Sequence, residues 1–273
     1  GSRGWVYQLG LGAVHRYHRN FHAGTTAEIV SQLTYVRRER QRQVVLFAED
    51  HRPFLERLVH DPENVRLHEE VGRQLRRSFP DYFAFLLTNP RGEPYWVDFD
   101  GYVGDICVED IQTFAERGYN HARIHPNPVE YHYDVMAHWQ AGTGRSRILM
   151  VSFKPDELVQ KLRAVRIPGH DLYMLLADNT NLIEVTAQGP RTVLDRDDYR
   201  MTAAEVGRTV HRQIIEGTRW ELADLYEPGF VSAYRRELQA DIGVFLIVFL
   251  AVAAVSILLI RREEQARRRA EEA

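Results

Sequence analysis

The stretch IGVFLIVFLAVAAVSILLI, residues 242–260, contains no charged residue and no proline. As a helix it would rise about 28 Å at roughly 1.5 Å per residue, close to the hydrocarbon thickness of a lipid bilayer. A helix in a soluble core would show a polar stripe within two turns, and here only Gly243 and Ser256 fall outside the strongly apolar set. The sequence therefore predicts a transmembrane helix at residues 241–260.

The charges on either side of this stretch predict its orientation. Asp241 precedes the stretch, and five arginines follow it within nine residues: Arg261, Arg262, Arg267, Arg268 and Arg269. Positively charged flanks stay in the cytoplasm, whereas acidic residues contribute little to topology. We therefore expect residues 1–240 to lie outside the cytoplasm and residues 261–273 to form a cytoplasmic helical segment.

The two ends of the sequence suggest neighbouring segments. Residues 1–22 hold only a short apolar run, 5–14, which is too short and too rich in glycine to span a bilayer. We interpret residues 1–22 as the remnant of an N-terminal membrane-proximal segment. The helix-prone run 261–273 leads us to expect an output domain after it.

Composition excludes some classes of partner. The 273 residues carry a formal net charge of -3, and the basic clusters are interleaved with acidic residues, so we predict no nucleic-acid partner. The single cysteine, Cys107, cannot form an intrachain disulfide, and we interpret it as a small buried apolar side chain.

Residues 23–240 show the periodicities of a mixed α and β domain. Apolar spacing predicts a long helix over 25–58 that is interrupted at Pro53, and a second helix over 64–77. Turn residues between short apolar runs predict three β-hairpins, a final strand and an exit helix. The predicted elements are hairpins 82–88/94–99, 128–139/147–153 and 171–177/182–187, helices 108–117, 155–165 and 202–208, strand 218–224 and exit helix 226–240. The predicted fold class is α+β: a PAS-like antiparallel sheet with a long N-terminal helix, followed by one transmembrane helix.

Several segments carry a resemblance to a known family. They are the Asn89–Glu93 turn, YHYDVMAHW (131–139) with RILMVSF (147–153), GHDLYMLLADNTNLIEVTAQGPR (169–191) and GTRWELADL (217–225). With the long helix, they make residues 23–240 resemble the Cache (PDC-like) sensor domains of bacterial receptors.

The resemblance implies an inner-membrane receptor with a periplasmic sensor. A small molecule would bind outside the membrane and displace the exit helix, and the receptor would be a homodimer formed through helix 25–58. The segments are most similar to sensors fused to diguanylate cyclase or phosphodiesterase (GGDEF or EAL) outputs, which implies cyclic-di-GMP signalling. The Arg-x-Trp-Tyr cluster of amino-acid-binding members is absent from the sequence, so the resemblance does not identify the ligand.

The segment 131–138 alternates as a strand, which places His132 and Asp134 on one face and Tyr133 on the other. In the family this strand lines the pocket, which implies ligand-binding roles for these three residues. The alternative is structural hydrogen bonding. His132 and His138 would lie about 20 Å apart along an ideal strand, too far to share one ion, so we predict no metal site on this face.

Three further groups are candidate ligand contacts. Arg123 and His125 alternate in HARIH and suit a carboxylate ligand, or else lie on a solvent-facing edge strand. Trp96 and Asp98 could bind a cationic ligand, although strand aromatics usually pack in a core. Asp171 and Tyr173 lie on a strand that reaches the sheet centre in the family.

Catalytic signatures are missing from the sequence. It contains no CxxC, HExxH or phosphate-binding glycine loop, and no nucleophile–base set can be assembled from it. We therefore predict a non-enzymatic sensor without a cofactor. The alternatives are a periplasmic protein-interaction module without a small ligand, and a membrane-anchored hydrolase, which would need an open cleft with His132 and Asp134 held in hydrogen bond to a serine or a metal.

Overall fold

The computed structural model describes residues 2–96, 102–142, 144, 146–165 and 167–271, and it consists of two compact units, Gly1–Leu225 and Tyr226–Ala273. The helices of the first unit are α1 (Ser2–Asp50), α2 (Arg52–His60), α3 (Val65–Ser78), α4 (Asp105–Arg117), α5 (Asp156–Ala164) and α6 (Ala203–Arg208), with a 3₁₀ turn at Arg191–Val193. Its strands are β1 (Tyr82–Thr88), β2 (His125–Pro126), β3 (Tyr131–Gln140), β4 (Ser146–Phe153), β5 (His170–Leu176), β6 (Ile183–Thr186), β7 (Thr209–Ile214) and β8 (Trp220–Tyr226). The second unit contains one helix, α7 (Phe230–Glu271).

Local chemistry explains where the helices begin and end. The break predicted at Pro53 is present, because α2 starts with this proline in its first turn and α1 has ended at Asp50. The side chain of Asn64 caps α3 by accepting the Leu67 N–H at 3.2 Å. At the end of α4, Gly118 adopts φ 76°, a left-handed conformation that favours glycine.

The first sheet has the strand order β1-β4-β3-β2, and its described pairings are antiparallel. The β3–β4 register pairs Tyr133 with Phe153 and Gln140 with Ser146, which confirms the hairpin predicted for this region. Residues alternate between the two faces of β3. Met136 packs toward α4 with Ile111 and Phe114, as part of a smaller apolar cluster.

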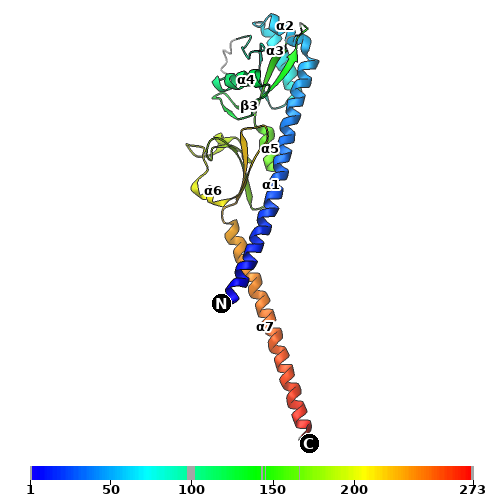
Figure 1. Ribbon diagram of the computed structural model, residues 1–273, viewed down its shortest axis with the longest axis vertical. Coiled ribbons are helices and arrows are strands. Elements are labelled where there is room, and N and C mark those ends of the chain that lie inside the picture. The colour runs from blue at the N-terminus through cyan, green and yellow to red at the C-terminus, as the bar shows by residue number, and fades with distance from the viewer. Residues whose placement is uncertain (1, 97–101, 143, 145, 166, 272–273) are drawn as a thin grey trace. The chain divides into compact units, whose positions relative to one another are not determined.

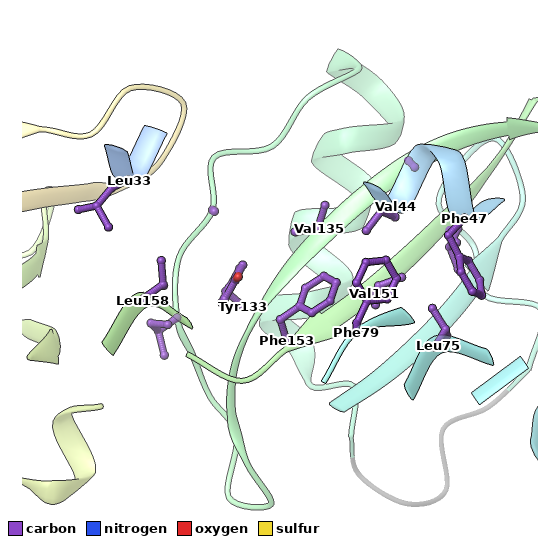
Figure 2. Close-up of a cluster of buried hydrophobic side chains, with 14 of the residues drawn as sticks. Leu33, Val44, Phe47, Leu75, Phe79, Tyr133, Val135, Val151, Phe153 and Leu158 are labelled. Carbon is purple, nitrogen blue, oxygen red and sulfur yellow. The ribbon is translucent and has the colours of Figure 1, made fainter. Parts of the chain in front are cut away.

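The main core lies on the opposite face of this sheet, where α1 packs (Figure 1). Figure 2 shows this core with Val135, Val151 and Phe153 of the sheet beside Val44 and Phe47 of α1. The buried guanidinium of Arg40 on α1 binds Asp81, at 3.0 Å, and Glu157. Charged side chains therefore join α1 to the start of β1 and to α5.

The second sheet has the order β6-β5-β8-β7, and α1 contacts its strand β7. A buried carboxyl group links this sheet to the segment that leads into β2: Glu184 on β6 accepts the backbone N–H of Ile124 at 3.2 Å and the indole N–H of Trp220. The α+β antiparallel prediction is confirmed, and the strands divide between two sheets.

Three elements differ from the sequence prediction. In the second arm of the first hairpin, the described residues 94–96 form an isolated bridge between Pro94 and Thr88, and the Tyr95 N–H donates to the Leu87 carbonyl at 3.1 Å; residues 97–99 lie outside the described residues. Strand β7 was not predicted; its residues are all partly exposed or exposed, so they lack a buried face that would give a clear alternation. Helix α1 starts at Ser2, well before Thr25.

Helix α7 includes the predicted transmembrane stretch. Its residues 230–269 are long and apolar enough to cross a membrane, and the most apolar part has no buried residue within the structure. Large side chains from Val244 to Ile260 are exposed, at 51–70% of their full areas, as a lipid-facing helix requires.

Candidate functional site

Four buried side chains meet between α4 and the first sheet. They are Cys107, His125, His132 and Asp134, with exposed fractions of 1%, 2%, 0% and 3%. Their nitrogen, sulfur and oxygen ligand atoms all lie within 4.8 Å of one another. We call this group the Cys107 cluster.

Three elements bring the cluster together. His125 on β2 pairs directly with His132 on β3, and cross-strand partners of this kind lie about 5 Å apart at Cβ. Asp134 follows two residues later on the same face of β3. Cys107 lies in the first turn of α4, where its backbone N–H donates to the carbonyl of Gly104 at 3.0 Å.

The distances inside the cluster are short. Cys107 Sγ lies 2.9 Å from His125 Nδ1 and 3.3 Å from His132 Nε2. Asp134 Oδ2 lies 3.2 Å from His125 Nδ1, and Asp134 Oδ1 lies 3.8 Å from His132 Nε2. One nitrogen of each imidazole therefore faces the same small space as the thiol and the carboxylate.

The other nitrogen of each imidazole has a partner outside the cluster. His125 Nε2 lies 2.8 Å from Asp110 Oδ2, and His132 Nδ1 lies 2.8 Å from the backbone carbonyl oxygen of Glu130. Both partners are acceptors, so the outer nitrogens carry the protons and the inner nitrogens of neutral rings carry lone pairs. Asp110 is held in turn by Arg123, whose Nη2 and Nε donate to it at 2.8 and 3.2 Å.

Within the described part of the chain, only one of the two carboxylate oxygens of Asp134 accepts a hydrogen bond. The hydroxyl of Ser152 donates to its Oδ1 at 2.6 Å. Among the described residues, no hydrogen bond of acceptable geometry reaches Oδ2, although His125 Nδ1 is close. A buried carboxylate oxygen without a donor is costly unless a positive charge lies near it, and the His125 imidazole is the group beside this oxygen.

The pKa values of the four cluster residues are shifted by burial and by the charges of their neighbours. Burial disfavours the imidazolium of His125, yet the charge of Asp134 and the hydrogen bond to Asp110 outweigh it and raise the pKa of His125 to about 12. Burial alone would raise the pKa of Asp134, but the charge of His125 lowers it to about 2. Burial raises the pKa of the Cys107 thiol and lowers the pKa of His132. A buried thiol with a raised pKa is the opposite of an activated cysteine nucleophile.

The structure brings together four of the predicted ligand residues: Arg123, His125, His132 and Asp134. His125 and Asp134 meet directly, and Arg123 joins them through Asp110. Tyr133 points to the opposite face of β3, into the main core, where its ring lies 5.8 Å from that of Trp220.

The remaining predicted residues lie elsewhere. The Trp96 ring packs on the edge of His68 with centroids 4.4 Å apart, whereas Asp98 lies outside the described residues. Asp171 and Tyr173 belong to the second sheet, where the Tyr173 hydroxyl donates to Glu205 at 2.9 Å. Of these four, the three that the structure describes contribute nothing to the Cys107 cluster.

Sequence reasoning missed the role of Cys107 and Asp110. Cys107 is buried, as predicted, but its sulfur contacts two imidazoles rather than only apolar groups. His138, which the strand pattern placed on the same face as His132, stacks on Phe114 and takes no part. The alternation of HARIH and YHYD marked most of the cluster, but no local pattern linked it to a cysteine in the preceding helix.

An open pocket of about 380 Å³ lies next to the cluster. Phe83 lines the pocket, and its ring centroid lies 5.1 Å from that of His132. Aromatic side chains form much of the wall, and two cationic residues complete it; the lining includes His68, Arg76, Tyr82, Phe85, Trp96 and Lys154. A second pocket of about 430 Å³ is lined by Asp171.

Comparison with known proteins gives distant structural likeness only. No family model matches the chain, and no curated protein matches it. Among solved structures, the sensor domain of the V. cholerae histidine kinase DctB is 9% identical with a TM-score of 0.48, and the match covers 78% of this chain and 98% of that one.

Two other solved structures are similarly distant. The match to the ligand binding domain of the Pseudomonas aeruginosa PAO1 amino acid chemoreceptor PctB, in complex with L-Arg, has 10% identity and a TM-score of 0.45 and covers 77% and 95% of the two chains. The match to an extracellular ligand binding receptor from Desulfohalobium retbaense DSM5692 has 11% identity and a TM-score of 0.46, and it covers 74% of this chain and 39% of the receptor. At these identities and scores the matches assign no function to this chain.

Proposed function

We propose that the chain is the periplasmic ligand-sensing input module of a bacterial inner-membrane receptor. The observation that carries the proposal is covalent continuity: the last strand of the folded unit, β8, ends at Tyr226, and α7 begins at Phe230 with an uncharged 19-residue stretch inside it. A change in the sheet therefore has one short connection to a helix that can cross a bilayer.

The ligand in this proposal is a small molecule bound in the 380 Å³ pocket. Its volume falls within the range of about 300–1,000 Å³ that is typical of ligand sites. The wall combines the flat surfaces of Trp96 and Tyr82 with the cations Arg76 and Lys154. This combination favours a small ligand with a carboxylate and a flat or apolar body.

The pocket is lined by residues of the first sheet, through which ligand binding can cause a conformational change elsewhere. Phe83 on β1 lines the pocket, and β1 is hydrogen-bonded to β4 in the centre of the first sheet. A ligand shifts such an equilibrium only if it binds one state more tightly than the other. We propose that the shift passes along α1 and the sheets to α7, and then to a cytoplasmic output domain such as a diguanylate cyclase.

The same proposal includes a homodimer formed through the outer face of α1. Tyr35 and Leu46 are exposed there at 68% and 42% of their full areas. The second candidate function is a protein-interaction module without a small ligand, which the exposed apolar residues of α1 favour.

The proposal is tested on the full chain in detergent, by thermal shift against carboxylates, amino acids, amines and purines. We expect a concentration-dependent rise in Tm with a carboxylate class. The rise should be lost in Arg76→Met and Trp96→Ala and kept in Arg73→Met, a neighbouring exposed arginine of α3. No shift with any class, from protein shown to be folded by circular dichroism, would favour the interaction module.

A further inference from the structure

We infer that Cys107, His125, His132 and Asp134 bind a single transition-metal ion, for which Zn²⁺ is the best fit. The inference rests on the geometry of the Cys107 cluster and stands whether or not the chain is a sensor.

The spacing of the donor atoms suits one tetrahedral ion. Metal–ligand bonds of about 2.0–2.3 Å place the ligand atoms of a tetrahedral zinc site roughly 3.2–3.8 Å apart. Cys107 Sγ lies 2.9 Å from His125 Nδ1 and 3.3 Å from His132 Nε2, and Asp134 Oδ2 lies 3.2 Å from His125 Nδ1. All four ligand atoms lie within 4.8 Å of one another, so small side-chain shifts would bring them around one ion.

The orientation of the imidazoles is the strongest argument. Histidine ligands of metals almost always donate their outer N–H to a carboxylate or a backbone carbonyl, which fixes the ring and its tautomer. His125 has the carboxylate of Asp110 in that position, and His132 has the carbonyl of Glu130. Oδ2 of Asp134, which accepts no hydrogen bond from the described residues and lies 3.2 Å from His125 Nδ1, faces the same space, and the Ser152 hydroxyl holds the carboxylate through Oδ1.

The charges balance when the ion is present. A thiolate, a carboxylate and two neutral imidazoles carry -2, which a divalent cation neutralises. Binding displaces the proton of the Cys107 thiol and the inner proton of His125, and both protons pass to solvent. Asp110 remains paired with Arg123.

The donor set selects the class of metal. One sulfur, two imidazole nitrogens and one carboxylate oxygen exclude Ca²⁺ and Mg²⁺, which take oxygen ligands. The thiolate and imidazoles suit zinc, and copper is the main competitor by intrinsic affinity. Four protein ligands and full burial leave no open position for a substrate, which is typical of a structural rather than a catalytic site.

The ion would add a link between elements that are already held by the Asp110–His125 hydrogen bond, strand pairing and packing. Cys107 belongs to α4, His125 to β2, and the other two ligands to β3. Metal binding would therefore fix the first turn of α4 against the sheet, and loss of the metal would release it.

The test uses the full chain purified in detergent, with metal content measured by inductively coupled plasma mass spectrometry. We expect one zinc ion per chain in the wild type and in His138→Gln, a matched control on the same strand outside the cluster. We expect loss of the ion in His132→Gln, Asp134→Asn and Cys107→Ser. Metal removal by a chelator should lower Tm in the wild type and the control only.

Replacement by Co²⁺ identifies the ligands directly. The wild type should show the visible bands of tetrahedral cobalt and a near-ultraviolet thiolate-to-cobalt band, and the thiolate band should vanish in Cys107→Ser. If Cys107→Ser does not fold, His132→Gln and Asp134→Asn provide the test in its place. Each keeps the thiolate but lacks one other ligand, so each should lose the visible bands of tetrahedral cobalt. Folded protein with neither bound metal nor cobalt bands would overturn the site, and one copper ion with a Cys107-dependent band would keep the site and overturn zinc.

Discussion

The Oδ2 atom of Asp110 lies 2.8 Å from Nε2 of His125, and these two residues come from different elements, α4 and β2. Arg123 donates two hydrogen bonds to the same carboxylate. Asp110 therefore orients the imidazole of His125 from behind, while the opposite nitrogen faces Cys107 and Asp134.

Replacing this carboxylate should weaken metal binding without removing a ligand. We expect Asp110→Asn to lower zinc affinity by about 10- to 100-fold, the usual effect of losing a partner of a histidine ligand. Competition with a zinc-binding dye measures the change. Glu109→Gln is the control, because Glu109 also binds Arg123 but is 68% exposed at its side chain and does not touch His125. Equal affinity in wild type and Asp110→Asn would contradict the assigned role.

Arg40 should be among the most sensitive positions of α1. Its guanidinium is buried with Asp81, whose pKa is raised by burial, and it lies 4.5 Å from the centroid of Phe153. Arg40→Met would leave Asp81 buried without its cation, at a cost of about 3–5 kcal/mol. Arg42→Met, an exposed neighbour, should change stability by less than about 0.5 kcal/mol. Thermal unfolding of both variants gives the comparison, and similar Tm values would refute the prediction.

Glu205 should make stability depend on acid pH. Burial would raise its pKa, but hydrogen bonds from Arg196, the Thr202 N–H and Tyr173 outweigh burial and lower the pKa to about 2. The folded pKa lies below the ordinary value of 4.5, so the stabilisation is present above pH 4.5 and disappears as the pH falls toward 2. At neutral pH the wild type should exceed Glu205→Gln by up to about 3 kcal/mol.

Unfolding of both proteins from pH 7 to pH 3 measures this difference, and groups common to both cancel. The advantage of the wild type should shrink below pH 4.5. Glu216→Gln, at an 81% exposed side chain, is the control, and it should change stability by less than about 0.5 kcal/mol. A constant difference across the range would show that the carboxylate charge is not responsible.

Glu184 should make the protein less stable as the pH rises, the opposite of the effect of Glu205. Burial outweighs the hydrogen bonds from Ile124 and Trp220 and the nearby charges of Arg191 and His125, and it raises the pKa of Glu184 to about 7. The folded state therefore holds a proton that the unfolded state has lost between pH 4.5 and 7, and stability falls as the pH rises through that window.

Glu184→Gln keeps an acceptor oxygen but cannot ionise. We expect it to be more stable than the wild type at pH 8 by up to about 3 kcal/mol, and equally stable near pH 4.5. The Tm values of the wild type and Glu184→Gln, measured at both pH values, test this prediction. A variant less stable than the wild type at pH 8 would mean that the ionised carboxylate is favoured in the fold.

The apolar stretch of α7 should tolerate charge at its end but not at its centre. Leu250→Arg places a charge mid-span and should raise the insertion free energy by about 2.5–3.5 kcal/mol. Ile260→Arg is adjacent to Arg261, where the side chain can reach the interface, so its effect should be small. Membrane fractionation of cells that express each variant tests this, and equal membrane recovery would argue against a spanning helix.

Several features of the fold were predictable from short sequence windows. The apolar stretch 242–260, the helix stop at Gly118 and the β3–β4 hairpin all follow from periodicity or turn chemistry within about twenty residues. Strand β7 was not predictable, because a partly exposed strand leaves no clear alternation of buried and exposed residues.

Part of the candidate site was likewise predictable from the sequence, and part was not. The alternation of residues 121–125 and 131–134 is enough by itself to place Arg123 with His125, and His132 with Asp134. Only the tertiary structure pairs His125 with His132 and docks α4 so that Cys107, 18 and 25 residues upstream of the two histidines, reaches both. Periodicity reports which face a residue occupies on its own element, whereas the meeting of faces depends on strand register and helix packing, which are decided by the whole core.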